Sequence, residues 1–482
     1  MTTVVWFSQD LRLADNPALA AALDRGAPIL PVYILDDDDA GDWKLGGASR
    51  WWLHKSLEAL RADLKQRGAD LILRHGPAEQ VIFDLIAETG ADAVYWNRRY
   101  EPLTIARNER LKAALGHKGV QARSFNGALL HEPWTIQTKA GGPYKVFTPF
   151  ARALRDAGAA SPGAAAPKSI PFPSKRPNSD DLDQWALLPT KPDWAGGMRE
   201  AWTPGEASAR EQLDDFCDGA VEHYASGRNR PGIAGVSRLS PHLHFGEISP
   251  RQVWAAVSAA GVARGGHHIS SDAETYLSEI LWREFAHHLL FHFPEMPTKA
   301  MHPEFEAMPW SDAHKPLEAW RRGLTGYPIV DAGMRELWTT GWMHNRVRMI
   351  VASFLIKHLM IDWRVGEAWF WDTLVDADLP ANAMNWQWVA GCGADAAPYF
   401  RIFNPMLQGE KFDTDGAYVR RWVPEIAGLP DKLLHTPWAA KAIDLKDAGI
   451  ELGRTYSRPI VDHEFARKRA LAAYRDIRQA AT

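Results

Sequence analysis

The strongest constraint on the fold is a change of pattern about a quarter of the way along the chain. The first 130 residues alternate short β-rich runs with helical stretches. The β-rich runs are residues 4–7, 29–35, 71–74 and 93–96, and the helical stretches are residues 48–66 and 77–88. Gly26, Gly68 and Gly90 precede the last three runs, as expected where a helix closes just before the next strand. The alternation predicts an open, parallel, Rossmann-like α/β sheet.

Beyond this region the pattern becomes helical. Residues 158–205 are rich in alanine, proline, glycine and serine, which is typical of a long connector over the surface. From about residue 206 helical periodicity dominates and β-rich runs are scarce. We therefore expect an α/β domain over residues 1–130, a connector over 131–205 and a large all-α domain over 206–482.

Composition excludes several classes of protein. The net charge is −4, so the chain is not a uniformly basic nucleic-acid binder, although a local basic face is compatible with this value. The two cysteines, Cys217 and Cys392, lie far apart and exclude a disulfide scaffold and any CxxC zinc or redox site. No apolar run approaches about 18 residues, and no basic leader precedes the first apolar run. We expect a soluble cytoplasmic protein with no membrane partner.

Common catalytic motifs are absent from the sequence. It contains neither GxGxxG nor GxxxxGK[ST], so the dinucleotide fingerprint and the P-loop are missing. Its histidines are scattered without HExxH or another ligand spacing, and no GxSxG elbow occurs. Hydrolase and metalloenzyme functions are therefore weakly supported, and we predict no metal site.

Two predicted helices carry polar residues at helical spacing on one face. In the helix predicted over 272–293, Glu279, Trp282 and Arg283 share a face, and over 342–359 Arg348 shares a face with Asn345 and Met349. Such a stripe is commonly a surface ion pair or ordinary packing, but it also suits the wall of a cleft. Because two such stripes occur in one domain, the sequence favours the wall of a cleft about as much as ordinary surface pairing or packing.

Two loops add candidate polar groups. Ser240-Pro241 has the pattern of a capping serine followed by proline at a helix start, and with Ser237 and Arg238 it could bind phosphate or be a plain capped helix. The segment Asp376 to Asn382 is acidic and predicts a loop that enters a helix. Its aspartates could bind a divalent cation, but pairing of an aspartate with Arg348 is favoured because no calcium-loop spacing is present.

Tryptophan is unusually abundant, at 22 of 482 residues. Core packing accounts for most of these rings. Trp386 and Trp388 follow the acidic loop, and with Trp310 and Trp363 they make this region rich in indoles. An electron-relay or base-stacking role is therefore worth testing.

Longer strings of residues resemble the DNA photolyase/cryptochrome family. The opening Trp6-Phe7, Asp10-Leu11-Arg12 and Asp15-Asn16-Pro17-Ala18-Leu19 is similar to the start of these proteins, and Ser237 to Pro241 and Trp282 to Phe285 are similar to their flavin-domain motifs. The match is densest at residues 325–332, 342–346, 395–401, 404–405 and 408–412. It spans nearly the whole chain.

The resemblance implies light-driven repair of cyclobutane pyrimidine dimers in UV-damaged DNA by a monomeric photolyase. FAD would lie in the helical domain, and a second, light-harvesting chromophore would lie in the N-terminal domain. In photolyases the excited, fully reduced flavin donates an electron to a dimer flipped out of the duplex, and the electron returns after the ring splits.

The resemblance also implies roles for individual residues. The flavin phosphates and ribityl chain would be held by Tyr224, Val236, Ser237, Arg238, Leu239, Ser240 and Arg283. The isoalloxazine would be flanked by Arg348, Asp376, Ala377, Asp378 and Asn382. The lesion would meet Glu279, Trp282, Asn345, Met349 and Trp388, and the DNA would meet Arg228, Arg346 and Gln408. The flavin-reducing electron chain would run through Trp386, Trp363 and Trp310.

Individual positions refine this expectation. Asn382 would face flavin N5 as a neutral acceptor, where plant cryptochromes have aspartate, and Asn345 and Met349 stand where (6-4) enzymes carry histidines. Val236 replaces a threonine that is frequent in relatives, so one hydroxyl contact to phosphate is missing. Residues 100–104 lack the Asn-Glu pair that binds a folate antenna in some bacterial photolyases. The antenna could therefore be methenyltetrahydrofolate bound differently, which we favour, a deazaflavin, or none.

Two other functions stay open at this point. A cryptochrome-type photosensor would signal through partners, and a long disordered C-terminal extension would favour it. The chain ends at Thr482, soon after the helical domain, so we expect no such extension. A flavin electron-transfer protein acting on small molecules would explain neither the pair Trp282 and Trp388 nor Arg228.

Overall fold

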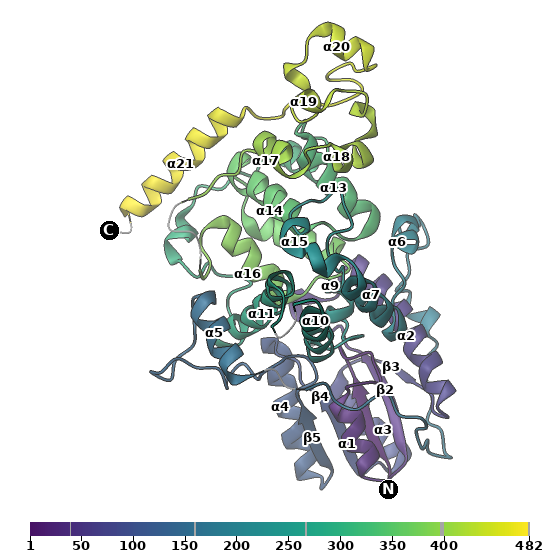
Figure 1. The fold of residues 1–482 in the computed structure, drawn as a ribbon. Coiled ribbons are helices and arrows are strands. Elements are labelled where there is room, and N and C mark those ends of the chain that lie inside the picture. The colour runs from purple at the N-terminus through teal and green to yellow at the C-terminus, as the bar shows by residue number, and fades with distance from the viewer. Residues whose placement is uncertain (39, 159–160, 266–267, 396–399, 481–482) are drawn as a thin grey trace.

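The computed structural model describes residues 1–482 except 39, 159–160, 266–267, 396–399 and 481–482. Residues 396–399 belong to one of the family-like strings and lie outside the described part. A sheet domain containing the N-terminus lies at one end of the molecule, and the helical domain with the C-terminal helix lies at the other (Figure 1). No helix in the described part of the chain is long and apolar enough to span a bilayer.

The sheet has five parallel strands in the order β3-β2-β1-β4-β5. The strands are β1 (Thr3–Phe7), β2 (Ile29–Leu35), β3 (Ile72–His75), β4 (Ala93–Asn97) and β5 (Gln121–Phe125). Side chains alternate between the faces of the sheet, so Val5 and Phe7 pack with α1 and α2 whereas Val4 and Trp6 pack with α3 and α4. The chain builds outward from β1 to β3 and then crosses back to β4, which creates a switch point between β1 and β4.

Helices occupy most of the remaining chain. The sheet is covered by α1 (Pro17–Asp24), α2 (Gly47–Gln66), α3 (Ala78–Thr89) and α4 (Pro102–His117). The stretch that follows contains α5 (Phe147–Ala157) and α6 (Gly196–Ala201). The helical domain contains α7 (Glu206–Asp218), α8 (Tyr224–Gly227), α9 (Ser240–His244), α10 (Pro250–Gly265), α11 (Ser271–His292), α12 (His314–Arg321), α13 (Pro328–Thr340), α14 (Asn345–Ser353), α15 (Trp363–Thr373), α16 (Leu379–Ala390), α17 (Pro405–Phe412), α18 (Ala417–Trp422), α19 (Asp431–Leu434), α20 (Ala442–Asp447) and α21 (His463–Ala480).

The strands and helices that were predicted by their residue ranges are present with small differences in their bounds, and the misses have physical causes. The predicted fold class, a parallel α/β sheet followed by a helical domain, is confirmed. The sequence analysis missed β5, an edge strand with the polar sequence QARSF that carries little apolar alternation. The helix predicted over 342–359 begins only at Asn345, and it continues after Ser353 as one π-helical turn, η5 (Phe354–His358). The helix predicted at Ser240-Pro241 is α9, with Ser240 as its first residue and Leu239 at the cap.

A buried polar network joins the two domains. The guanidinium of Arg12, only 1% exposed, donates to the carbonyl oxygens of Asp15 at 2.7 Å, Gly127 at 2.6 Å and Gly246 at 2.9 Å. Gly246 lies on the helical-domain side and has φ 65°, and a Cβ there would lie 2.1 Å from the carbonyl oxygen of Gln9. The close approach therefore requires glycine at this position.

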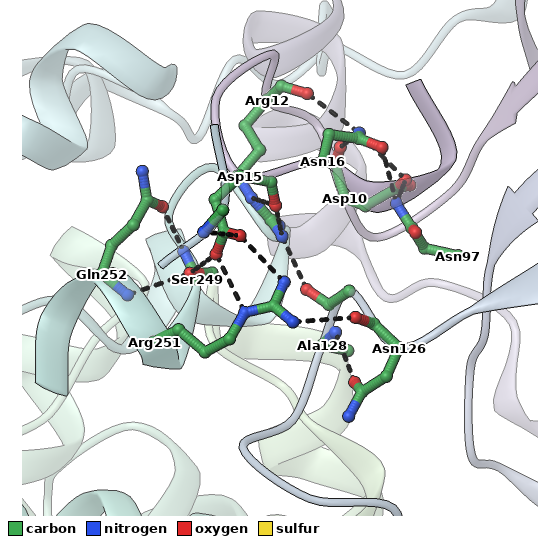
Figure 2. A network of polar contacts seen from close by, with 12 residues as sticks. Asp10, Arg12, Asp15, Asn16, Asn97, Asn126, Ala128, Ser249, Arg251 and Gln252 are labelled. Carbon is green, nitrogen blue, oxygen red and sulfur yellow. Dashed lines mark hydrogen bonds and ion pairs between the residues drawn. The ribbon is translucent and has the colours of Figure 1, made fainter. Parts of the chain in front are cut away.

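The same loop after β1 is bonded from several directions (Figure 2). Asp15 accepts a hydrogen bond from Ser249, which directly precedes α10, and pairs at 3.0 Å with Arg251 in the first turn of α10. Asn97, at the end of β4, donates to Asp10 at 2.6 Å and to Asn16 at 2.8 Å. The family-like opening of the sequence thus fixes the helical domain onto the switch point of the sheet.

Arg12 should be a main contributor to stability. Arg12→Leu leaves three buried carbonyl oxygens without their donor, so we expect the free energy of unfolding to fall by about 3 to 5 kcal/mol. Guanidinium chloride titration followed by far-UV circular dichroism measures the change. The control is Arg454→Leu, which removes an exposed arginine paired with Glu451 and should leave the midpoint unchanged. Equal midpoints for Arg12→Leu and the parent protein would contradict this assignment.

Candidate functional site

A cavity of about 430 Å³ lies within the helical domain. Its walls come from α11, α14, α15 and α16, and from the segment that precedes α16. The two polar stripes noted in the sequence therefore form walls of a cleft. The predicted site residues that line the cavity are Arg228, Ser240, Glu279, Trp282, Arg283, Asn345, Arg348, Met349, Asp376, Ala377, Asn382, Trp386 and Trp388.

An ion pair fixes the segment that enters α16. Arg348 of α14 donates to both carboxylate oxygens of Asp376, at 2.8 and 3.0 Å, and also to the carbonyl oxygen of Met343 at 2.7 Å. The predicted pairing is confirmed. A single guanidinium nitrogen, Nη2, contacts both oxygens, so one positive and one negative charge lie side by side in the cavity wall.

Asp378 caps α16 and carries a stabilised negative charge. Its carboxylate accepts from the amide of Ala381 at 3.1 Å, the usual geometry of a helix N-cap. Burial alone would raise the pKa of Asp378, but His287, His244 and Arg283 nearby hold it well below its usual range. The start of α16 is therefore anchored by an ionised group within a ring of positive or protonatable side chains.

Asn382, one turn further along α16, has a fixed amide. Its side-chain NH₂ donates to the carbonyl oxygen of Glu367 at 3.0 Å. The amide oxygen is thereby left as a hydrogen-bond acceptor at the cavity wall. This neutral acceptor matches the group that the resemblance assigns to flavin N5–H.

Glu279 of α11 forms a second ion pair at the cavity. Its Oε1 lies 2.7 Å from Nη1 of Arg228, and both side chains are about a quarter exposed (28% and 25%). Burial raises the pKa of Glu279, and Arg228 opposes the shift only in part. The carboxyl group is thus held closer to protonation than an exposed glutamate.

Two indoles complete the wall around Glu279. Trp282 stacks on Phe147 with ring centroids 3.6 Å apart and planes 6° from parallel, and Phe147 does not line the cavity. Trp388 donates its ring N–H to the carbonyl oxygen of Asp395 at 3.2 Å. The sequence analysis missed Phe147, because it lies in the connector without a motif around it.

Other predicted residues do not line this cavity. Ser237 accepts from the hydroxyl of Tyr276 at 3.0 Å, and the guanidinium of Arg238 lies 4.1 Å from the ring centre of Trp202. Arg346 donates to Asn229 at 2.6 Å. The predicted residues outside the lining are Tyr224, Val236, Ser237, Arg238, Leu239, Asp378, Arg346, Gln408, Trp363 and Trp310.

Comparisons with known proteins place this geometry in a family. Residues 3–171 match the family model described as DNA photolyase, and residues 276–476 match the FAD binding domain of DNA photolyase. A deoxyribodipyrimidine photo-lyase of Agrobacterium fabrum is 57% identical, with 99% of this chain and 98% of that protein covered. This chain belongs to the DNA photolyase/cryptochrome family.

Within the family the chain is similar to a solved photolyase structure and, at lower identity, to a cryptochrome. A crystal structure of a bacterial class III photolyase from Agrobacterium tumefaciens has a TM-score of 0.95 at 56% identity and covers 99% of this chain and 98% of its own. Cryptochrome-1 of Arabidopsis thaliana is 38% identical over 97% of this chain and 69% of its own length. The chain thus carries the FAD-binding domain of this family.

The three tryptophans assigned to electron transfer belong to one packed core. Trp386 is 2% exposed, and its ring centre lies 5.0 Å from that of Phe370. A Cβ on Gly366 would lie 2.1 Å from the Trp386 ring, so glycine at this position of α15 makes room for the indole. Trp363, 1% exposed, begins the same helix, and Trp310 is partly buried against the same core.

A second cavity of about 320 Å³ lies at the carboxyl edge of the sheet. It is lined by Ser8 and Gln9 after β1, by Asp37 after β2, and by Glu101 and Thr104 after β4. Open α/β sheets bind ligands at this edge, beside the switch point. Residues 101–104, where the folate pair of other photolyases is missing, therefore face a cavity. Aromatic rings of Trp6, Tyr33, Trp43 and Trp371 also line it.

Arg348 and Asp376 should contribute to the free energy of unfolding as a coupled pair. Arg348→Met leaves the Asp376 carboxylate, whose side chain is 4% exposed, without a counter-charge. We expect the free energy of unfolding to fall by about 3 kcal/mol. Adding Asp376→Asn removes the buried charge and should recover part of this loss. Denaturant titration of the two variants measures both effects, and additive losses in the double variant would contradict the coupling.

Proposed function

We propose that this protein repairs cyclobutane pyrimidine dimers in DNA in a light-driven reaction that uses reduced FAD. The observation that carries the proposal is the shared cavity, in which Glu279, Trp282 and Trp388 face the same space as Asn382. An acid, two flat stacking surfaces and a neutral acceptor are the groups that this chemistry requires. The high identity to a deoxyribodipyrimidine photo-lyase over the whole chain supports the same function.

The cavity residues suit FAD. The pyrophosphate needs cations and hydroxyls, which Arg283 and Ser240 supply at the wall, and Arg238 has a buried Nε that lacks a protein partner. Loaded with FAD, the protein gains a light-absorbing group that in its reduced, excited form gives an electron to the dimer and takes it back. Arg348 and Asp376 would flank the ring system, and the oxygen of Asn382 would accept from N5–H.

The lesion would lie on the other side of the same cavity. Trp282, backed by Phe147, and Trp388, held by Asp395, would stack on the flipped pyrimidines. Glu279 would donate a proton in a hydrogen bond to a pyrimidine carbonyl oxygen, and its raised pKa favours the protonated form that can do so. This donor would stabilise negative charge that develops on the dimer. Asn345 and Met349 would complete the pocket.

Cations at the rim would hold the DNA backbone. Arg228 lies at the cavity edge, and Arg346 lies over the ring of Phe412 at 4.5 Å on the same side as α17. Gln408 belongs to α17, whose start is capped by Asn404. Phosphate contacts of this kind position a duplex without reading its sequence.

Trp386, Trp363 and Trp310 would carry electrons that reduce the flavin. Trp386 faces the cavity, Trp363 is buried behind it on α15, and Trp310 is the partly exposed member. This order from cavity to surface suits a chain of hops from solvent to FAD.

The second cavity would hold the antenna chromophore. Its aromatic rings, Trp6, Tyr33, Trp43, Phe245 and Trp371, offer flat apolar surfaces, and Arg99, paired with Glu101 at 2.6 Å, supplies a cation at its wall. We propose methenyltetrahydrofolate as the occupant, with a deazaflavin as the alternative that the absorption spectrum would reveal.

The function is tested by irradiating the reduced holoprotein with an oligonucleotide that contains one dimer. We expect blue light to remove the dimer and darkness to leave it intact. Glu279→Ala should lower the repair rate at saturating DNA by about tenfold or more, because the hydrogen-bond donor is lost, while flavin photoreduction survives. Retention of dimers by the wild-type protein in light would contradict the proposal and favour a photosensor.

The pH dependence of the repair rate tests whether the proton of Glu279 is needed. Because burial raises the pKa of Glu279, repair at saturating DNA should fall as pH rises through that raised value, since the donor becomes a carboxylate. Glu279→Gln keeps a neutral donor of the same shape and should repair with little dependence on pH over the same range. A parallel decline in both proteins would contradict a proton-donor role for Glu279.

The antenna cavity is tested by filling it. Thr104→Trp places an indole at a lining position of α4, so we expect purified protein to lose the absorption of the second chromophore and to retain FAD. Ala113→Trp, at an exposed position of the same helix, is the matched control and should retain both. Equal chromophore content in the two variants would place the antenna elsewhere.

A further inference from the structure

A buried lysine lies directly behind the wall of the lesion pocket. Lys357, in the π-helical turn η5, is 3% exposed. Its ammonium donates to the carbonyl oxygen of Val389 at 2.6 Å and to that of Arg401 at 2.5 Å. It also lies 4.5 Å from the ring centre of Phe400.

This ammonium joins the π-helical turn to two stretches of chain more than 30 residues further along. Val389 belongs to the last turn of α16, and Arg401 precedes α17. Ser353, at the end of α14, accepts from the amide of Phe403 at 3.3 Å and adds a second tie between η5 and the same stretch. The π-helical turn thus holds both the end of α16 and the chain that leads into α17.

The hydrogen bonds of Lys357 affect the lesion pocket through Trp388, which is the neighbour of Val389 in the sequence. Trp388 and Val389 line the large cavity, and both also line a small cavity of about 20 Å³ whose wall includes Lys357 and Arg401. Trp388 and Val389 are thus shared between the wall of the lesion pocket and the wall of the cavity that contains the lysine. A shift of the Val389 backbone would move the neighbouring ring of Trp388.

The energetic cost of this arrangement indicates a specific role. Burial lowers the pKa of Lys357 to about 7, so keeping a charge at this position is unfavourable. Two carbonyl oxygens and an aromatic face offset part of the cost. An apolar side chain would fill the same volume without that cost but would leave two carbonyl oxygens unbonded.

We propose that Lys357 is a positioning residue for DNA repair, which holds Trp388 at the angle required to stack on a flipped dimer by bonding the carbonyl oxygens of Val389 and Arg401. This inference rests on the proposed function of the large cavity. Lys357 touches neither the flavin site nor the lesion side of that cavity, so its effect should appear in lesion affinity and not in flavin chemistry.

The test compares binding of dimer-containing and undamaged oligonucleotides by the FAD-loaded protein at pH 6.5. For Lys357→Met we expect about tenfold weaker binding of the dimer-containing strand, unchanged binding of undamaged DNA, and unchanged FAD content and photoreduction. Lys357→Arg keeps the positive charge, and the small cavity beside residue 357 gives room for the larger guanidinium. This variant should therefore keep most of the affinity for the dimer-containing strand. Lys432→Met, at an exposed position of α19, controls for the loss of a positive charge.

A double-variant cycle decides whether Lys357 acts through Trp388. In a Trp388→Ala background, Lys357→Met should weaken binding by less than about twofold further. Full additivity, unchanged affinity in Lys357→Met, or loss of FAD from that variant would each overturn the inference, because the lysine would then act elsewhere or support the whole domain. If the wild-type protein neither prefers dimers nor repairs them, the proposed function fails instead, whatever the variants do.

Discussion

The ion pair between Arg348 and Asp376 sets the geometry on which the site depends. It ties α14 to the segment that enters α16, and these two elements supply opposite parts of the cavity wall. With this pair in place, the cap at Asp378 starts α16, and one turn later Asn382 is held by Glu367. A single charged contact thus positions an anion, a cation and a neutral acceptor around one cavity.

The same segment also separates the two cavities. Leu379 lines the cavity at the sheet edge, whereas Ala377 and Ala381 line the cavity in the helical domain. The buried network around Arg12 fixes the sheet against the helical domain from the other side. Two chromophores held in these cavities would therefore keep a constant distance and orientation, which efficient energy transfer between them requires.

Much of this arrangement could be predicted from the sequence. Helical periodicity placed Glu279 and Trp282 on one face of a predicted helix, and both line the cavity. Asn382 was predicted only from the resemblance to the family, because its segment carries no helical pattern of its own. Charge and the absence of a metal-ligand pattern favoured pairing of an aspartate with Arg348, and the resemblance to the family indicated Asp376. Local pattern therefore supplied the faces of two helices, and the resemblance supplied the roles of the residues on them.

The supports behind the site could not be predicted in this way. Phe147 reaches Trp282 from the connector, and Lys357 reaches Val389 through a π-helical turn that shifts the helical register. The edge strand β5 is polar and lacks the alternation of a half-buried strand. In each case the partner is distant in sequence, and tertiary packing decides the contact.

The central claim is that a dimer drawn out of the duplex lies in the large cavity between two indoles and against Glu279. The most direct measurement is a crystal structure of the FAD-loaded protein bound to a duplex that carries one dimer, grown in darkness. The account predicts the two pyrimidines outside the base stack, in contact with Trp282 and Trp388 and hydrogen-bonded to Glu279. A dimer that remains stacked in the duplex, or that lies against another face of the protein, would contradict it.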